Sequence, residues 1–241
     1  RLEGEPGRLI VRPEAGQEHD LEIETAGGQR LRITTLTRAE AERTWKGQAW
    51  GQERVIVSPA DLVFLNDGLE VRSTGTVEAA LSVWPAVGGR VQAQGAECAQ
   101  TEGGGRTKLC VSLGERAVAL EVRPAGARKF VVRLPEGFPT GIEDVFLRVD
   151  YVGDTGMAFI DGRLVADHFN NGTPWVIGLK RFKAELLTGE LCLVFSPWRQ
   201  GVVKNISSQL AGRFEFEGDE RLEVQRISAL PEYRTRLTLE G

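Results

Sequence analysis

Apolar and polar residues alternate with a period of two along most of the chain. The alternation comes in short runs such as "HDLEIET", "QRLRITTL", "KFVVRLP" and "VFLRVDY", which Gly, Pro, Asn and Asp separate from one another. Successive side chains of a strand point to opposite faces, so this pattern is typical of strands with one buried face. Turn residues recur about every 8–12 positions, as in antiparallel sandwiches and barrels. The pattern predicts an all-β protein and argues against a TIM barrel or a Rossmann fold.

One segment interrupts the alternation. In "TLTRAEAERTWKG", Thr37 is placed as an N-cap with Glu40 three residues later, which is the spacing of a capping box. Ala41 and Trp45 are four residues apart and would share one helix face, and Gly47 would end the segment. We therefore expect a short helix over residues 38–46, with Trp45 packed on a sheet. A hairpin is expected in "LVFLNDGLEVRS", with its turn at Asn66–Asp67–Gly68.

A domain boundary is expected near residues 86–92, where a glycine-rich polar stretch with a weaker strand pattern begins. We predict two antiparallel β-sandwich domains. Residues 1–88 would form a small sandwich that carries the short helix. Residues 89–241 would form a sandwich of the jelly-roll kind.

Length and charge exclude some partners. The 241 residues suffice for one sizeable core or two smaller ones. With 30 basic and 34 acidic residues and a net charge of −4, nothing favours a nucleic acid or an anionic membrane as partner. The longest apolar runs, such as Leu191–Phe195, are too short to cross a bilayer. Because the chain starts at Arg1 and its one methionine is Met157, we expect a processed chain or a fragment, and the compartment stays open.

Three cysteines, Cys98, Cys110 and Cys192, form no CxxC pair and no cluster with histidine. A structural zinc site is therefore not expected. Cys98 and Cys110 flank Gly103–Gly105, so a hairpin there would bring them near each other. A disulfide and two free thiols are both compatible with the spacing, and free thiols are favoured because spacing alone does not give facing geometry.

Two stretches carry a resemblance to a known family. "RITTLTRAEAERTWKGQAWGQERVIVSPADLVFLNDGLEVRS" resembles a non-catalytic β-domain that follows the barrel in glycoside hydrolase family 35 β-galactosidases. "DVFLRVDYVGDTGMAFIDGRLVADHFNNGTPWVIGLKRF", followed by "LCLVFSPW", resembles the galactose-binding-like jelly roll of bacterial members. The second stretch is the more specific, because it combines many fixed spacings. The stretches follow the family's order and, with the linking strands, cover most of the chain.

The chain departs from that family where catalysis is concerned. The family's catalytic part is a (β/α)₈ barrel with two glutamates about 5 Å apart, and no βα alternation for a barrel is present here. No residue is therefore expected to be catalytic. The resemblance implies a non-catalytic accessory region that braces a catalytic glycosidase domain of the same parent protein. The alternative is a structural or protein-interaction module without affinity for glycans.

Local residues offer little for catalysis or for a metal. Asp154 and Asp161 lie in "GDTG" and "DG", which are turn sequences, so a carboxylate pair for acid/base chemistry is not favoured. The only histidines are His19 and His168, and no GxSxG motif exists. Asp150 and Asp154 give a weak case for a structural calcium ion without the spacing of a calcium loop. No other cofactor is expected.

A sugar-binding rim is the remaining candidate. Sugars are held by an aromatic platform together with short polar side chains, and the two segments "DHFNNGTPW" and "SPWRQ" combine both kinds of residue. The candidate residues are Asp167, His168, Asn170, Asn171, Trp175, Trp198 and Arg199. A purely structural interpretation competes with this one and is favoured: Phe169 and Trp175 would fill the core, and Asn171–Gly172 would form a tight turn.

Overall fold

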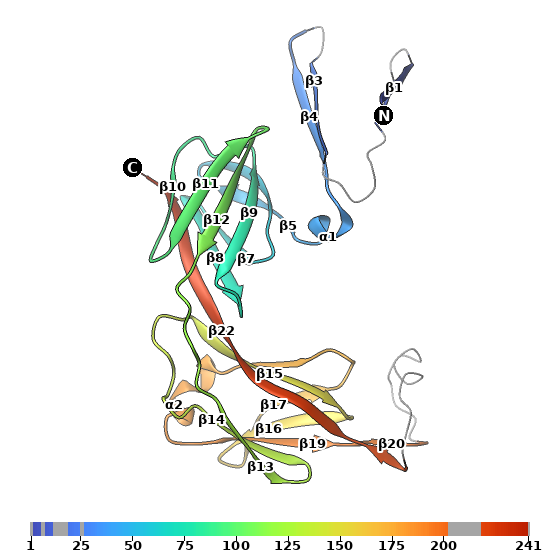
Figure 1. The fold of residues 1–241 in the computed structure, drawn as a ribbon, viewed down its shortest axis with the longest axis vertical. Coiled ribbons are helices and arrows are strands. Elements are labelled where there is room, and N and C mark those ends of the chain that lie inside the picture. The colour runs from blue at the N-terminus through green and yellow to red at the C-terminus, as the bar shows by residue number, and fades with distance from the viewer. Residues whose placement is uncertain (1, 6–7, 12–18, 25–26, 202–217, 241) are drawn as a thin grey trace. The chain divides into compact units, whose positions relative to one another are not determined.

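The computed structural model describes residues 2–5, 8–11, 19–24, 27–201 and 218–240 (Figure 1). The described chain is nearly all β, as the alternation predicts, and its strands pair antiparallel. It divides into two compact units. Unit 1 comprises Arg1–Leu113 together with Thr235–Gly241, and unit 2 comprises Gly114–Arg234.

The predicted boundary at residue 88 is therefore wrong in position. The glycine-rich stretch that suggested a linker contains the hairpin between β11 (Glu97–Gly103) and β12 (Arg106–Ser112), both of which belong to unit 1. Glycine tracts serve tight turns as well as linkers, and the sequence pattern did not separate these two uses. The segment that leads into unit 2 is 113–120, which carries no strand.

Unit 1 contains a five-stranded antiparallel sheet. Its order is β11–β12–β9 (Glu78–Trp84)–β6 (Gln52–Val57)–β5 (Thr44–Ala49). The expected hairpin is confirmed as β7 (Asp61–Leu65) and β8 (Gly68–Thr74), and β10 (Val91–Ala93) pairs with the end of β22 (Glu223–Leu239). Two further hairpins pair β1 (Leu2–Glu5) with β2 (Arg8–Val11) and β3 (His19–Glu24) with β4 (Arg30–Thr35).

The core of unit 1 follows the alternation of these strands. On β9, Ala79, Leu81 and Val83 are buried while the residues between them are more exposed. They join one cluster whose largest members come from six other segments: Trp50, Ile56, Leu62, Leu69, Leu109 and Leu237. Burying a side chain of this size stabilises the fold by about 1.5–3 kcal/mol relative to leaving it exposed.

The helix of unit 1 is shorter than predicted. α1 spans Arg38–Ala41, and the capping box is confirmed, since Thr37 Oγ1 accepts from the amide of Glu40 and Glu40 Oε2 accepts from the amide of Thr37. Trp45 lies on β5 opposite Ile56 rather than on a helix. Gly47 lies within β5, where a Cβ would meet the Phe64 ring at 2.5 Å. The glycine allows a close approach between strands and does not end a helix.

Unit 2 contains two antiparallel sheets, consistent with a β-sandwich. One has the order β13 (Glu121–Gly126)–β14 (Lys129–Arg133)–β19 (Leu191–Ser196)–β16 (Thr155–Ile160)–β17 (Arg163–Phe169). In the other, β15 (Asp144–Val152) lies between β18 (Trp175–Gly178) and the first part of β22. The turn η1 (Lys180–Phe182), the short helix α2 (Lys183–Leu186) and the ladder of β20 (Trp198–Arg199) with β21 (Glu220–Arg221) complete the unit.

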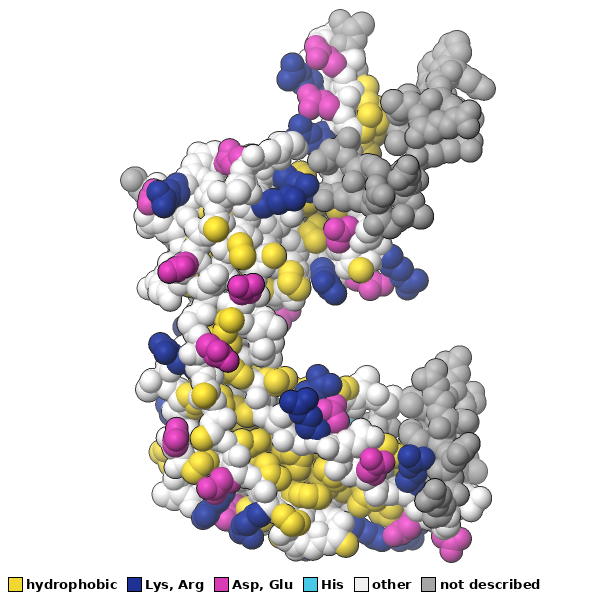
Figure 2. Space-filling model, in the orientation of Figure 1, with side chains coloured by type: hydrophobic (Ala, Val, Ile, Leu, Met, Phe, Trp, Pro, Cys, Tyr) yellow, Lys and Arg dark blue, Asp and Glu magenta, His cyan; other side chains and the backbone are white. Residues whose placement is uncertain are grey.

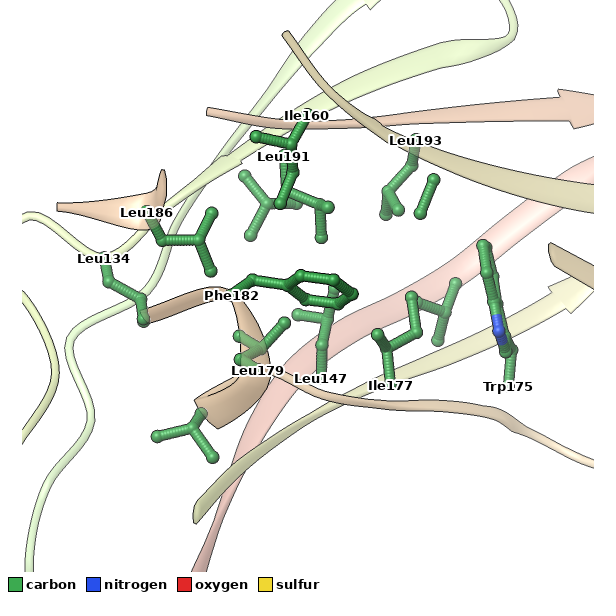
Figure 3. Close-up of a cluster of buried hydrophobic side chains, with 14 of the residues drawn as sticks. Leu134, Leu147, Ile160, Trp175, Ile177, Leu179, Phe182, Leu186, Leu191 and Leu193 are labelled. Atoms are coloured by element: carbon green, nitrogen blue, oxygen red, sulfur yellow. The ribbon is translucent and has the colours of Figure 1, made fainter. Parts of the chain in front are cut away.

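The core of unit 2 draws on both of its sheets (Figure 3). Every second residue of β15 is buried, and the buried residues of β19 are Leu191, Leu193 and Phe195. Phe182 and Leu186, from η1 and α2, are buried in the same cluster. The apolar residues of the alternating pattern thus form two inward-facing layers of side chains.

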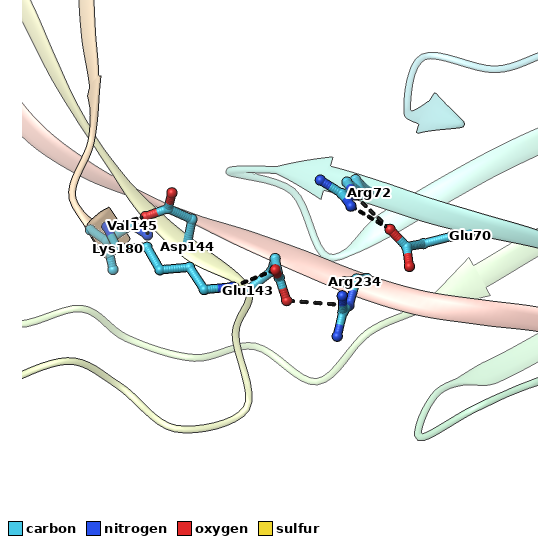
Figure 4. Close-up of polar contacts among 7 residues, drawn as sticks. All are labelled: Glu70, Arg72, Glu143, Asp144, Val145, Lys180 and Arg234. Atoms are coloured by element: carbon cyan, nitrogen blue, oxygen red, sulfur yellow. Dashed lines mark hydrogen bonds and ion pairs between the residues drawn. The ribbon is translucent and has the colours of Figure 1, made fainter. Parts of the chain in front are cut away.

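Carboxylates at the start of β15 fasten neighbouring segments of unit 2 (Figure 4). Glu143 forms ion pairs with Lys180 and with Arg234, the latter at 3.2 Å. Asp144 Oδ1 accepts from the amides of Val145 at 2.6 Å and Lys180 at 2.8 Å. These contacts fix η1 against the first residues of β15.

The register of the β11–β12 hairpin decides the state of two cysteines. Cys98 lies opposite Val111, whereas Cys110 lies opposite Ala99. Directly opposite residues share a face, and a shift of one residue changes the face. The thiols of Cys98 and Cys110 therefore point to opposite sides of the sheet, and both are free.

Within the part of the chain that the structure describes, no helix has the length and apolar character needed to cross a membrane.

Candidate functional site

The predicted sugar-binding rim follows two turns of unit 2. Asp154 lies in the turn from β15 to β16, which belong to different sheets, so this turn is not a hairpin. Asp161–Gly162 form the expected two-residue hairpin between β16 and β17, with φ values of 49° and 76°. Positive φ at both positions is the geometry for which the Asp-Gly pair is favoured. The rim residues begin on β17 and end where β18 starts.

Both tryptophans of the rim are packing residues. Trp175 is 4% exposed and lies edge-on to Phe195, with ring centroids 6.4 Å apart. A Cβ on Gly156 would meet Trp175 at 2.7 Å, so this glycine makes room for the indole. Trp198 is 6% exposed, and its Nε1 donates to the carbonyl of Gly153. The burial of Trp175 agrees with the favoured structural interpretation, and neither indole presents a ring face to a sugar.

Asn170 is also used internally. The residue is only 6% exposed. Its Nδ2 donates to the carbonyl of Tyr151 at 3.0 Å, and its Oδ1 accepts from the amide of Gly172 at 2.8 Å. The amide of Asn170 donates to the carbonyl of Asp154. Both ends of the side-chain amide are satisfied within the fold, so this residue fastens the loop and offers no group to a sugar.

His168 lies in a small aromatic cluster. Its Nδ1 is 2.9 Å from the hydroxyl of Tyr151, and its ring is stacked on Trp175. Burial lowers the pKa of His168 from its ordinary value. Burial, with a smaller contribution from the charge of Asp154, strongly raises the pKa of Tyr151. Both shifts favour uncharged rings, and this arrangement serves packing rather than proton transfer.

The remaining rim residues are exposed. Asp167 and Asn171 are exposed, and Asn171 Oδ1 accepts from the amide and the hydroxyl of Thr173, which is a local turn. Arg199 is exposed on β20 and forms an ion pair with Glu220 at 3.9 Å. The structure thus leaves three of the seven candidates, Asp167, Asn171 and Arg199, at the surface.

Phe169 is the residue that the sequence interpretation placed wrongly. It was expected in the core, yet it is 76% exposed at the end of β17. Phe169 lies opposite Thr155 and Leu164 lies opposite Phe159, four residues further along β16, so the two side chains share the outer face. A register shift between Ala158 and Phe159 breaks the simple alternation. The alternation next to His168, which faces inward, was the signal that could have placed Phe169 outside.

Asp150, one of the two residues proposed for calcium, has a partner within its own strand. Asp150 accepts from Arg148 in an ion pair of 3.0 Å. The amide of Asp154 donates to the carbonyl of Ser196 at 2.8 Å, which ties its turn to β19. Among the described residues, no group of three or more His, Cys, Asp or Glu side chains is arranged to hold a metal ion. The structure therefore adds no support for the calcium hypothesis.

Unit 1 contains a cavity that the sequence did not indicate. Its volume is about 390 Å³, and it is lined by residues from four segments of unit 1: Arg32, Thr34, Leu36, Val55, Trp84, Pro85 and Gly105. No motif links these positions, which lie in four segments far apart in the sequence. Leu36, Val55, Trp84 and Pro85 give the cavity apolar walls, while Arg32 and Thr34 supply its polar side chains.

Comparison with protein-family models and with curated proteins gives no match for this chain. No protein-family model matches the sequence. No curated protein matches it either.

Proposed function

We propose that the chain is a non-catalytic accessory region of a carbohydrate-active protein, and that it braces a catalytic glycosidase domain of the β-galactosidase kind. The resemblance of two stretches to family 35 β-galactosidases supports the carbohydrate context. The antiparallel sheets of both units are compatible with the β-domains of that family. The observation that supports a bracing role is that residues of the predicted rim form packing contacts and hydrogen bonds within unit 2.

The most specific stretch of the resemblance consists largely of packing positions. Gly153 is closely surrounded, since a Cβ there would lie 3.0 Å from the carbonyl of Ser196. Gly156 accommodates Trp175, and Asn170 fastens the loop to Tyr151. Fixed spacings of this kind maintain a rigid framework, which is what an element that positions another domain requires. They do not present reactive groups to a substrate.

Two measurements test this proposal. Sequencing the gene on both sides of the codons for Arg1 and Gly241 is expected to reveal a (β/α)₈ barrel with two glutamates in the same reading frame. A gene without such a barrel would contradict the accessory role. The purified chain is expected to show no turnover of nitrophenyl β-galactoside. Turnover that follows the chain through successive purification steps would contradict its non-catalytic character.

A second candidate function, a protein-interaction module, has one observation in its favour. β17 is the edge strand of its sheet, and its outer face carries Phe169 at 76% and Leu164 at 50% exposure. Hydrophobic side chains also gather on the viewed face of unit 2 (Figure 2). Edge strands with exposed apolar side chains are ready sites for pairing with another chain. A Phe169→Ser variant would then lose a binding partner or self-association in sedimentation experiments, while its unfolding midpoint stayed near that of the wild type.

A further inference from the structure

The cavity of unit 1 has the size and the lining of a small-molecule site. Its volume of about 390 Å³ falls within the range of ligand pockets, about 300–1,000 Å³. The indole of Trp84 is partly exposed and lines the cavity together with Val55 and Pro85. Arg32 and Thr34, both on β4, add hydrogen-bonding groups. Such sites characteristically combine mostly apolar walls with a few placed polar groups.

Trp84 is held in place by its neighbours. It is paired with Val55 across β9 and β6, and the guanidinium of Arg106 lies 5.2 Å from the centre of the indole. The next residues are fixed by Arg54, a buried side chain whose Nη1 donates to the carbonyl of Pro85 and, at 3.0 Å, to that of Ala86. The platform is therefore formed before any ligand arrives, which lowers the cost of binding.

The charge at the polar side of the cavity is compensated. Arg32 Nη2 donates to Glu22 Oε2 at 2.8 Å, an ion pair across β3 and β4. The side chain of Arg32 also lies directly over Gly105, where a Cβ would meet Nη1 at 1.3 Å. The guanidinium thus already has a carboxylate partner. A hydroxyl, which both donates and accepts, suits this pair better than an anion does, because an anion would compete with the carboxylate of Glu22.

We infer that this cavity binds a neutral sugar residue, with its apolar C–H face against Trp84 and its hydroxyl edge towards Arg32 and Thr34. The cavity itself is independent of the proposed function, whereas the choice of a sugar over another amphipathic ring rests on it. The site lies in unit 1 and uses none of the seven residues that the sequence suggested in unit 2.

The test is a titration of the whole chain with D-galactose, D-glucose and D-galacturonate, followed by ¹⁵N-resolved NMR. We expect a neutral sugar at millimolar concentration to shift the Trp84 indole N–H and the amides around residues 32–36. Trp84→Ala is expected to weaken binding about tenfold or more, since truncating a central aromatic removes most of the contact. Thr34→Val, which keeps the shape and removes the hydroxyl, is expected to weaken it about threefold to tenfold.

Asn171→Ala in unit 2 is the control and should bind like the wild type. If Trp84→Ala does not fold, Thr34→Val still tests the site. Shifts confined to residues 167–175, no shift with either neutral sugar, or a preference for galacturonate would each overturn the inference. A failure here leaves the accessory role untouched, because that role is tested by the gene and by the turnover assay. A gene without a barrel, conversely, leaves the titration valid.

Discussion

The imidazole of His168 lies parallel to the indole of Trp175, with ring centroids 5.9 Å apart and an interplanar angle of 7°. The same imidazole lies 2.9 Å from the hydroxyl of Tyr151. Three strands, β15, β17 and β18, thus meet at one histidine, and the two sheets of unit 2 are joined there. Burial of the imidazole favours its neutral form, because a charged ring would lose solvation in this cluster.

Protonation of His168 should therefore destabilise unit 2. Burial lowers the pKa of His168 in the folded state, whereas the unfolded chain has an ordinary value of about 6.5. The stabilisation is present in full above about pH 6.5 and is lost as the pH falls towards the lower folded pKa. We expect the free energy of unfolding, measured with urea between about pH 7 and pH 5, to decrease with falling pH.

His168→Gln provides the comparison for the pH series. Glutamine keeps an acceptor for Tyr151 and does not titrate, so its unfolding free energy should depend less on pH. His19, the other histidine, remains in both proteins and cancels in the comparison. Identical pH slopes for the two proteins would show that His168 is not the group responsible.

Trp175→Ala should be among the most destabilising substitutions in unit 2. The indole is 4% exposed and fills space beside Phe195 and Gly156, so its removal leaves a cavity in the core. The expected loss is about 3–5 kcal/mol in chemical denaturation. Phe169→Ala is the matched control, because this ring is 76% exposed and its loss should change stability by about 0.5 kcal/mol or less. Equal losses for both would contradict the packing described for β17 and β18.

The neighbouring asparagines form a second matched pair. Asn170→Ala removes the donor to the Tyr151 carbonyl and the acceptor for the Gly172 amide in a buried position. We expect a loss of about 1–3 kcal/mol, because the partners are left unsatisfied. Asn171 is exposed, so Asn171→Ala should cost a few tenths of a kcal/mol, or about 0.5 kcal/mol at most. Thermal or urea unfolding compares the two, and a larger loss for Asn171→Ala would reverse their assignment.

The strands were predictable because one face of each is buried, as on β15 and β9. The Asp161–Gly162 hairpin was predictable because both positions need positive φ. The shared outer face of Phe169 and Leu164 was not predictable, since the register shift at Ala158/Phe159 places an extra residue on β17 between them. The local alternation does not reveal where such a bulge falls.

The cavity of unit 1 could not be predicted from the sequence, for a different reason. Arg32, Val55, Trp84 and Gly105 are separated by more than twenty residues each, and only the folded chain brings them together; of the four, Val55 and Trp84 are paired on adjacent strands. The capping box, by contrast, is a contact between Thr37 and residues within three positions of it, and it was predicted correctly. Interactions between close neighbours were thus accessible to sequence reasoning, whereas sites assembled from distant strands were not.

Gly47→Ala distinguishes the strand from the helix that the sequence suggested. At a helix end, alanine would be tolerated at small cost, whereas on β5 a Cβ would meet the Phe64 ring at 2.5 Å. We expect a loss of about 1–3 kcal/mol, since inserted carbon atoms force a packed region to shift. Gly88→Ala is the control, because nothing lies within 4 Å of its Cβ position. Combining Gly47→Ala with Phe64→Leu should recover part of the lost stability. If it does not, the loss is not caused by a clash between the new Cβ and the Phe64 ring.

The thiols of Cys98 and Cys110 should react separately and should not form an intramolecular disulfide. Cys110 is exposed, whereas Cys98 is half-buried and burial raises the pKa of its thiol. In a Cys192→Ser background, a thiol reagent at about pH 8 is expected to modify Cys110 first and Cys98 about tenfold or more slowly, because the thiolate is the reactive form. Cys110→Ser should remove the fast phase and leave the slow one. Mild oxidation that consumes both thiols of a monomer together would contradict the register of β11 and β12, which directs the two side chains to opposite faces of the sheet.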